Sequence, residues 1–386
     1  MAASQDEQSV ATTQRYWDKL TAEFTKRHPD IKVEVTIHPQ AAIDAEVRNL
    51  QRAKDLPDLV QGGSYVEPAH RGELYTAEQV TSTRTQAAFT TSLADAGSVQ
   101  RQQFGLPFSA NTRMFLYNTR LFDKAGLKEA PSTWKELRGH AAKLKDAGVR
   151  TPYGLPLGDA APEGQALSWL LSGGGGYTDS SGTYVINSPS NISTFDWLQK
   201  NLVKEGLSYQ EPGVINDEVA FQSFLEGDVA MINGDSSLAR RAREKGIDCG
   251  LAIPPGRSGP MTVTAATVEW MMAFKQNGHR EEIRTFLDYL YRDANVREYA
   301  EQHEVMPVTT AASDAMRTGK KGKELGRFFR SLETARFYPM NKRTWKPTLE
   351  TLRKEIGQAV GGDGDPKGAL SKIQQRAMEA EQTTGR

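Results

Sequence analysis

The chain has 386 residues, of which 38% are hydrophobic and 25% are charged, a composition typical of a soluble globular protein. This length predicts two folded units, each large enough to bury its own apolar interior. Lys and Arg number 48 together and are balanced by 48 Asp and Glu, so the overall basic field that nucleic-acid binding usually needs is missing. A neutral or weakly charged small molecule is therefore the expected partner.

Cysteine and histidine usage argues against a metal site. Cys249 is the single cysteine, so an internal disulfide and a thiolate metal site are both excluded, and we expect a small buried residue at the start of a strand. The 6 histidines lack the HExxH spacing of a zinc site, and we expect neither a metal nor a cofactor. The run Gly361–Asp365 is similar to a calcium loop but lacks its final Glu, so a turn before the last helix is the simpler interpretation.

The N-terminal part of the chain alternates between helix and strand. Trp17, Leu20 and Phe24 share one face of a predicted helix. Residues 31–37 alternate apolar and charged side chains at period two, which predicts a strand with one solvated face. A second helix and a short buried strand at 56–60 follow, a βαβ order that implies a parallel sheet.

Polar residues follow both of these strands, at the carboxyl ends where open α/β sheets place ligands. Gln40 comes after the first strand, and Ser64 and Tyr65 come after the second. Ligand contacts and ordinary solvated loops are both consistent with this placement.

The stretch 105–137 marks a passage from one folded unit to the next. It predicts an extended segment ending at Pro107, a polar turn at 109–112, a strand at 114–117 and a helix that stops at Gly126. Thr133 and Glu136 then have the spacing of a capping box, which starts another helix.

Two glycine-containing stretches further on are candidate ligand loops. The four glycines before Tyr177 lack the Gly-Lys-Ser/Thr of a phosphate loop, so we expect a turn that brings backbone close to a ligand. A helix ending at Gly227 precedes a strand and the turn 233–237. Asp235 and Ser236 in that turn either contact the ligand or cap the next helix.

These motifs together resemble the extracellular solute-binding proteins of ABC importers, in the group of maltose, oligosaccharide and glycerol-3-phosphate receptors. The resemblance lies in the order of Leu106-Pro107, Tyr117-Asn118, Leu121-Phe122, Ala125-Gly126-Leu127, Pro131 to Leu137, Gly227 to Met231 and Met306-Pro307-Val308. It covers nearly the whole chain. It implies an α/β, two-lobed periplasmic-binding-protein-like fold, in which each lobe is a mixed sheet flanked by helices and a hinge joins the lobes.

The resemblance also implies a domain division and a function. Lobe one is expected at 1–111 plus 260–318 and lobe two at 112–259 plus 319–386, with the ligand cleft between them. The expected function is capture of a carbohydrate, an oligosaccharide in the first place, by hinge closure, and its delivery to the membrane permease of the importer. We expect a monomer that is not an enzyme and binds no nucleic acid.

Similar receptors place ligand contacts at further positions of this chain. Asn111 lies in the passage between lobes, and Tyr338 and Arg343 lie in the tail that re-enters the cleft. Glu269 and Trp270 lie where the chain returns to lobe one, and an indole there would stack on a sugar face. Adjacent residues of a regular strand face opposite ways, so core packing is the alternative for Trp270.

Two other functions remain open at this point. A receptor for glycerol-3-phosphate or a glycerophosphodiester would use Arg336 or Arg343 for the phosphate, although the Gly-Gly and Tyr that such receptors carry are replaced by Ala265-Ala266 and Val305-Met306. A glycoside-acting enzyme would need two suitably spaced carboxylates.

The first ten residues, MAASQDEQSV, have neither the basic start nor the apolar core of a signal peptide, and no apolar run is long enough to span a membrane. Considered alone, this pattern predicts a cytoplasmic protein. The resemblance instead implies an extracellular protein, periplasmic or anchored as a lipoprotein, whose leader has been removed.

Overall fold

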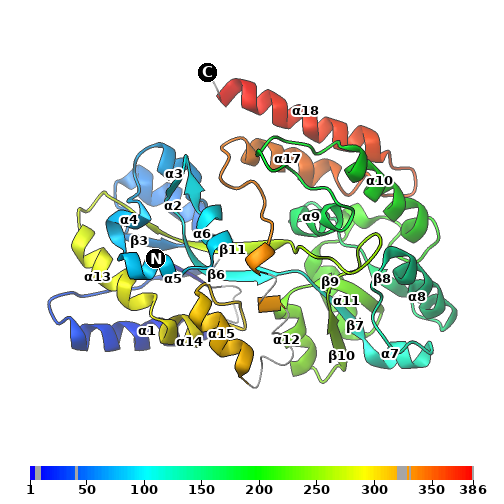
Figure 1. Cartoon of the computed structure of the whole chain (residues 1–386), viewed down its shortest axis with the longest axis horizontal. Coiled ribbons are helices and arrows are strands. Elements are labelled where there is room, and N and C mark those ends of the chain that lie inside the picture. The colour runs from blue at the N-terminus through cyan, green and yellow to red at the C-terminus, as the bar shows by residue number, and fades with distance from the viewer. Residues whose placement is uncertain (5–9, 40–41, 320–327, 330–331, 385–386) are drawn as a thin grey trace. The chain divides into compact units, whose positions relative to one another are not determined.

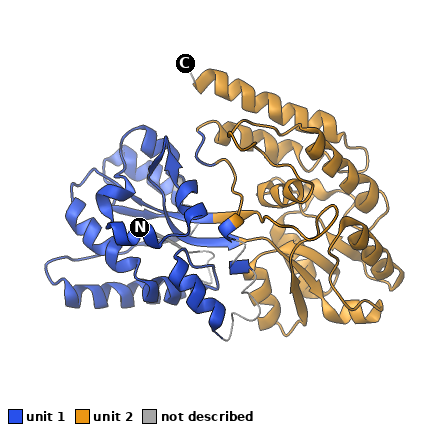
Figure 2. Cartoon of the chain, in the orientation of Figure 1, with its two compact units in different colours: residues 1–111, 268–333, 340–342 blue, residues 112–267, 334–339, 343–386 orange. Residues whose placement is uncertain are grey.

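The computed structural model describes residues 1–4, 10–39, 42–319, 328–329 and 332–384. The chain divides into two compact units, shown in different colours in Figure 2. Unit 1 comprises residues 1–111, 268–333 and 340–342, and unit 2 comprises residues 112–267, 334–339 and 343–386. Each unit is therefore assembled from stretches that are far apart in the sequence.

Unit 1 is organised around a three-stranded sheet in the order β3-β11-β6, in which β11 runs antiparallel to β3 (Figure 1). Two small sheets accompany it, a parallel pair of β1 with β2 and an antiparallel pair of β4 with β5. The strands are β1 (Ala2–Ser4), β2 (Ile37–Pro39), β3 (Leu59–Gln61), β4 (Ser98–Val99), β5 (Gln102–Gln103), β6 (Leu106–Thr112) and β11 (Ala266–Ala273). The helices are α1 (Val10–Arg27), α2 (Ile43–Ala53), α3 (Val66–His70), α4 (Ala77–Val80), α5 (Thr83–Ala88), α6 (Thr91–Ala96), α13 (Arg280–Leu290), α14 (Asp293–His303), α15 (Thr310–Thr318) and the 3₁₀ turn η4 (Leu332–Thr334).

Unit 2 contains a four-stranded mixed sheet in the order β10-β7-β9-β8. Strand β7 is antiparallel to both of its neighbours, whereas β8 is parallel to β9. The strands are β7 (Met114–Asn118), β8 (Thr151–Gly154), β9 (Val229–Gly234) and β10 (Cys249–Ala252). The helices are α7 (Thr119–Lys124), α8 (Trp134–Asp146), α9 (Glu163–Ser172), α10 (Pro189–Leu198), η2 (Gln199–Val203), η3 (Pro212–Val214), α11 (Asp217–Glu226), α12 (Ser236–Glu244), α17 (Trp345–Glu355) and α18 (Pro366–Thr384). The last two helices pack side by side, as Figure 1 shows.

Aromatic clusters form the core of each unit. In unit 1, Phe24 of α1 meets Phe286 of α13 edge to face at 5.1 Å between ring centroids. In unit 2, Trp134 of α8 lies 6.0 Å from Trp169 of α9 and 4.9 Å from Trp197 of α10. Such pairs add directional stabilisation to the area that they bury, and they fix how the helices pack.

Local signals predicted several helix ends correctly. The hydroxyl of Thr133 accepts a hydrogen bond from the Glu136 N–H and the Glu136 carboxylate accepts one from the Thr133 N–H, which is the predicted capping box of α8. Helix α11 ends at Gly227, whose φ of 84° needs a residue without a Cβ.

The strand predicted at 31–37 is mostly wrong. Side-chain exposure alternates along residues 31–36, as the sequence pattern requires. Within the described residues, however, this stretch is not paired with another strand, and the strand β2 covers only Ile37–Pro39. The alternation therefore reports one covered face and not a strand in a sheet.

The polar turn predicted at 109–112 is also wrong, because β6 continues through these residues to Thr112. The main chain leaves its strand only at Arg113, whose N–H donates to the Ala265 carbonyl at 3.1 Å. Cys249 does start a strand, as predicted, but it is half-buried and not fully buried.

The unit boundaries differ from the lobes that the resemblance implied, since residues 260–267 belong to unit 2 and residues up to Glu333 belong to unit 1. The first difference has a local cause, because Ala265 pairs with Arg336 in a parallel bridge within unit 2. The second difference also has a local cause, because the Ser92 hydroxyl donates a hydrogen bond to the Leu332 carbonyl at 2.5 Å within unit 1.

Candidate ligand-binding site

A partly buried ion pair lies at the start of unit 2. The Arg113 Nη2 donates to Asp217 Oδ2 at 2.8 Å, and the two side chains are 13% and 25% exposed. Arg113 is the single residue between β6 and β7, and Asp217 is the first residue of α11. The helix N-terminus favours the negative charge of Asp217, so both the helix and the arginine hold this carboxylate in place.

Amide groups extend the ion pair into a network. Gln165 of α9 donates through Nε2 to Asp217 Oδ1 at 3.2 Å and to the Asn233 carbonyl at 2.6 Å. Within the described part of the chain, three buried atoms of this network have no hydrogen-bond partner: Arg113 Nη1, Gln165 Oε1 and Asn233 Oδ1. Because an unpaired buried polar atom is costly, one donor and two acceptors here are suited to a further polar group.

An aromatic pair borders the network. Tyr338 stacks on Trp345 with ring centroids 6.1 Å apart and planes 20° apart, and Tyr177 lies 5.2 Å from Trp345. A Cβ built on Gly164 would lie 2.8 Å from both the Tyr338 hydroxyl and Arg113 Nη2. Glycine at position 164 therefore lets α9 approach both side chains.

A second ion pair completes the cluster. Arg353 of α17 donates through Nη2 to Glu163 Oε1 at 2.6 Å and through Nε to Oε2 at 3.2 Å. The Tyr177 hydroxyl donates to the Glu163 carbonyl at 2.8 Å, so a predicted site residue is connected to this pair. Glu163 is 10% exposed, and the bidentate arginine compensates its charge.

The surroundings of Arg113 favour its charged form. Burial disfavours the charged guanidinium, but the neighbouring Asp217, Asp235 and Tyr338 outweigh this effect and raise the pKa of Arg113 above its ordinary value. Burial also raises the pKa of the Tyr338 hydroxyl, which is therefore protonated at neutral pH. We call the residues Arg113, Asp217, Gln165, Asn233, Tyr338, Glu163, Arg353 and Asp235 the unit 2 polar cluster.

Some predicted site residues of unit 2 join this cluster and others do not. Tyr338 and Asp235 act on Arg113, and Tyr177 contacts Glu163. The Oδ1 of Asp235 accepts from the N–H groups of Ser237 and Leu238 at 3.0 and 3.1 Å, so the capping alternative holds for this atom. Ser236 is buried in the first turn of α12, and Arg343 is exposed.

In unit 1, Trp270 is 1% exposed and meets Tyr65 edge to face at 5.1 Å. A Cβ on Gly105 would lie 2.9 Å from the Trp270 indole and 2.8 Å from the Tyr65 ring, so these side chains fill the interior of their own unit. This packing favours the core alternative for Trp270, and its contact with a ligand stays a prediction.

Glu269 points to the opposite face of β11, as the alternation requires. Its Oε2 accepts from the Ser109 hydroxyl at 2.8 Å and from Gln61 Nε2 at 3.1 Å. Burial raises the pKa of Glu269, and the two hydrogen bonds lower it less than burial raises it. Asn111 is half-buried near the end of β6, Ser64 is exposed, and Gln40 lies outside the described residues.

Four residues of the cluster are not predictable from the sequence motifs: Arg113, Asp217, Gln165 and Glu163. Their contacts join residues far apart in the chain, so no local pattern contains them. One signal was present: Arg113 is a charged residue directly before the apolar strand Met114 to Leu116, where solvent exposure alone would not explain it.

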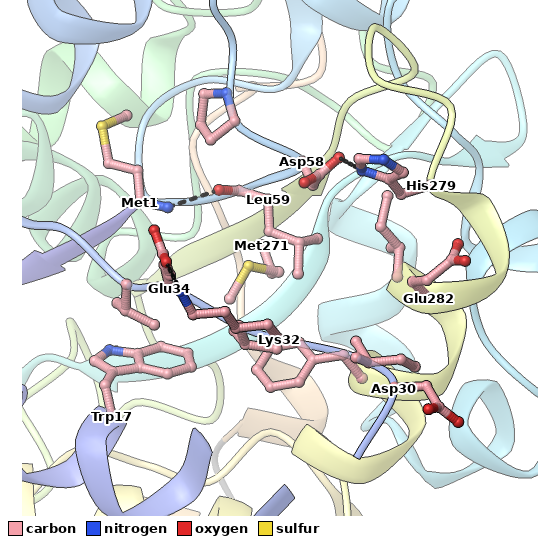
Figure 3. Close-up of a pocket in the computed structure, with 16 residues that line it drawn as sticks. Met1, Trp17, Asp30, Lys32, Glu34, Asp58, Leu59, Met271, His279 and Glu282 are labelled. Atoms are coloured by element: carbon pink, nitrogen blue, oxygen red, sulfur yellow. Dashed lines mark hydrogen bonds and ion pairs between the residues drawn. The ribbon is translucent and has the colours of Figure 1, made fainter. Parts of the chain in front are cut away.

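A groove in unit 1 offers a second candidate site (Figure 3). It has a volume of ≈ 390 Å³ and lies between the stretch 30–35, β3 and α13. A hydrogen-bond contact between His279 Nδ1 and Asp58 Oδ1 at 3.0 Å and an ion pair of Lys32 with Glu34 border it. Among the described residues, its lining includes none of the predicted ligand contacts, and Asp30 and Glu282 add further carboxylates to it.

Comparison with known proteins identifies the class. The chain belongs to the family of bacterial extracellular solute-binding proteins, whose model matches residues 10–297. The family predicted from the sequence motifs is thus confirmed. In the described part of the chain, no helix has the length and apolar character that a membrane crossing needs, and no group of three or more His, Cys, Asp or Glu is arranged to hold a metal.

Individual relatives are more distant. A binding protein of Brucella abortus (strain 2308) is 27% identical over 281 residues, which cover 71% of this chain and 67% of that protein. The sn-glycerol-3-phosphate-binding periplasmic protein UgpB of Escherichia coli is 26% identical over 223 residues, which cover 55% of this chain and 50% of that protein. The match thus spans half the length of that relative.

Solved structures share the fold. The cyclic alpha-maltosyl-1,6-maltose binding protein from Arthrobacter globiformis is similar with a TM-score of 0.84 and 19% identity, over 98% of this chain and 97% of that chain. The sugar-binding protein MalE from Xanthomonas citri is similar with a TM-score of 0.82 and 18% identity, over 99% of this chain and 97% of that chain. The predicted α/β fold of periplasmic-binding-protein type is confirmed.

Proposed function

We propose that this protein is the receptor of an ABC importer that captures a carbohydrate outside the cell, an oligosaccharide in the first place, and delivers it to the membrane permease. The observation that carries the proposal is the stacked pair Tyr338–Trp345 beside the unpaired donor and acceptors of the unit 2 polar cluster. Sugars present apolar C–H faces to aromatic rings and hydroxyls to paired donors and acceptors. The receptor binds without catalysing a reaction and works as a monomer.

Names of similar proteins support the ligand class. The structures described above include receptors named for maltose-containing and other sugars. Tyr338, Asp235 and Tyr177 are our proposed contacts from the sequence, and Arg113, Asp217 and Gln165 are added from the structure. The remaining sequence-derived contacts, Gln40, Ser64, Tyr65, Asn111, Ser236, Glu269, Trp270 and Arg343, stay predictions.

The second candidate ligand is glycerol-3-phosphate, which the relative UgpB is named for. The arginines proposed for its phosphate, Arg336 and Arg343, are both exposed. A single experiment separates the candidates: a thermal-shift screen with maltose, maltotriose, larger oligosaccharides, glycerol-3-phosphate and glycerophosphodiesters. Ligand binding raises the melting temperature by mass action, so we expect a shift with a neutral sugar. A panel without any shift would contradict the proposed function.

The proposal also includes closure of the two units on the ligand and an extracellular location of the protein. If the two units close on the ligand, small-angle scattering will show compaction with the sugar that gives the largest thermal shift. An unchanged radius of gyration would contradict closure. The natural protein is extracellular, periplasmic or held as a lipoprotein after removal of its leader, and the N-terminal sequence of the protein isolated from cells tests this.

A further inference from the structure

The Arg113–Asp217 ion pair has a consequence for ligand charge. An arginine at a ligand site often binds phosphate, because its planar fork of donors matches the phosphate oxygens. Here Nη2 is already bonded to Asp217 at 2.8 Å, and Asp235 adds a second negative charge near the same guanidinium. The fork is therefore partly occupied and its charge is compensated.

The formal charges of the whole cluster also disfavour an anionic ligand. Arg113 and Arg353 contribute two positive charges, whereas Asp217, Asp235 and Glu163 contribute three negative charges. A phosphorylated ligand would bring further negative charge next to these carboxylates. Like charges placed together at a binding interface cost affinity, and burial strengthens the effect.

The unpaired atoms carry the chemical argument. Arg113 Nη1 can only donate, while Gln165 Oε1 and Asn233 Oδ1 can only accept. A hydroxyl group both accepts and donates, so sugar hydroxyls are chemically matched to all three atoms. A phosphate dianion only accepts, so its oxygens match Nη1 but not the two amide oxygens, which a phosphate placed against them would leave without a partner.

From these contacts we infer that the Arg113–Asp217 pair selects an uncharged polyol and rejects a phosphorylated one. Arg113 is the specificity-determining residue, since it offers one nitrogen to a ligand hydroxyl, and Asp217 keeps its charge from attracting an anion. The inference rests on the proposed function and deepens it, because it assigns the ligand to the unphosphorylated class.

The test removes the compensating charge and keeps the shape. In Asp217→Asn, the amide still fits beside Arg113, but one of the two carboxylates that neutralise the guanidinium is removed. Calorimetric titration with glycerol-3-phosphate and glucose-1-phosphate, and with glycerol, glucose and maltose as neutral probes, gives the ratio of phosphate to neutral affinity. We expect wild type to prefer neutral probes and the variant to raise this ratio by at least about tenfold.

Asp235→Asn is a second variant that keeps the experiment decisive if Asp217→Asn fails to fold. Asn caps a helix about as well as Asp, so α12 keeps its start while the charge near Arg113 falls. We expect Asp235→Asn to raise the ratio of phosphate to neutral affinity by less than Asp217→Asn does. Asp228→Asn is the matched control, because its partner Arg150 is 80% exposed and outside the polar cluster, and it should leave the ratio unchanged.

The possible outcomes test the inference and the proposed function separately. Wild type that binds glycerol-3-phosphate more tightly than any neutral probe overturns the inference, and so does an unchanged ratio in folded variants. Wild type that prefers neutral probes, with unresponsive variants, leaves the proposed function standing and removes the role of the ion pair. If neither wild type nor variants bind any of these probes, the inference is wrong, while the carbohydrate assignment is decided by the thermal-shift panel with maltotriose and larger oligosaccharides.

Discussion

Gly164 lies directly against Tyr338, such that a Cβ on the glycine would sit 2.8 Å from the tyrosine hydroxyl. The same Cβ would sit 2.8 Å from Arg113 Nη2. Both atoms are the ends of flexible side chains, so a larger residue would displace them without moving the main chain. The fit of α9 against the polar cluster is thus a requirement of the site rather than of the fold.

Gly164→Ala should separate binding from stability. Alanine favours a helix interior over glycine by about 1 kcal/mol, which offsets the cost of moving two side chains. We expect the free energy of unfolding to change by less than about 1 kcal/mol, while affinity for the best sugar falls about tenfold. Urea denaturation and calorimetry measure the two effects.

The control for this substitution is Gly139→Ala in α8, where a Cβ would meet nothing within 4 Å. It should stabilise the protein by up to about 1 kcal/mol and leave affinity unchanged. Equal affinity in both glycine variants would contradict the role assigned to Gly164.

The Arg113–Asp217 pair should show strong energetic coupling. Breaking a partly buried pair leaves one charge with little solvent to compensate it, so each single variant, Arg113→Met or Asp217→Asn, should destabilise more than a variant of an exposed pair does. A double-mutant cycle should give a coupling energy of about 1 to 3 kcal/mol. The pair Arg150–Asp228, with side chains 80% and 46% exposed, provides the comparison and should couple by less than about 1 kcal/mol. Similar coupling in both pairs would argue against a structured ion pair at the site.

Glu269 should make the stability of the protein depend on pH. Its ordinary pKa is 4.5, and burial raises this value in the native state despite the bonds from Ser109 and Gln61. The native state then binds the proton more tightly than the unfolded chain does. The favourable contribution is complete below pH 4.5 and is lost as the pH rises through the native pKa.

Two variants at or near Glu269 test whether the stability of the protein falls, as predicted, when the pH rises. Glu269→Gln should flatten the loss of stability above pH 4.5, because no proton is released there. Ser109→Ala should steepen it, since removal of a bond to the carboxylate raises the native pKa further. Chemical denaturation at a series of pH values measures both slopes, and parallel slopes in all three proteins would contradict the assignment.

Trp270→Ala should act on stability. The indole is 1% exposed and packs against Tyr65, so truncation should cost about 3 to 5 kcal/mol of unfolding free energy. The milder Trp270→Phe keeps enough folded protein to measure binding, which should stay within about twofold of wild type. A large loss of affinity with normal stability would instead identify Trp270 as a ligand contact.

The fold could be predicted where its signals are local. The capping box of Thr133 and Glu136 and the glycine end of α11 each involve residues a few positions apart. The stretch 31–36 was assigned wrongly because alternation describes which side chains are covered, while a strand also needs a neighbour. The polar run 109–112 looked like a turn, yet these side chains lie within a strand where Ser109 bonds to Glu269.

The site was only partly predictable for the same reason. Tyr338 was proposed through resemblance to related receptors, which encodes spatial information that one sequence lacks, and Asp235 was proposed from its place before a helix; both stay predictions as ligand contacts. Arg113, Asp217 and Gln165 come together from the link between β6 and β7, from α11 and from α9, and their spacing in the chain has no recognisable pattern. Pairing across such distances requires the three-dimensional structure.

The discontinuous assembly of the two units determines when each can form during synthesis. The central strand of unit 1, β11, pairs with β3, although most of unit 2 is encoded between them. Unit 2 in turn needs α17 and α18, the last helices described in the chain. Since unit 1 lacks β11 and unit 2 lacks α17 and α18 until late in synthesis, we expect both units to be completed only late, through contacts of long sequence separation, which form slowly.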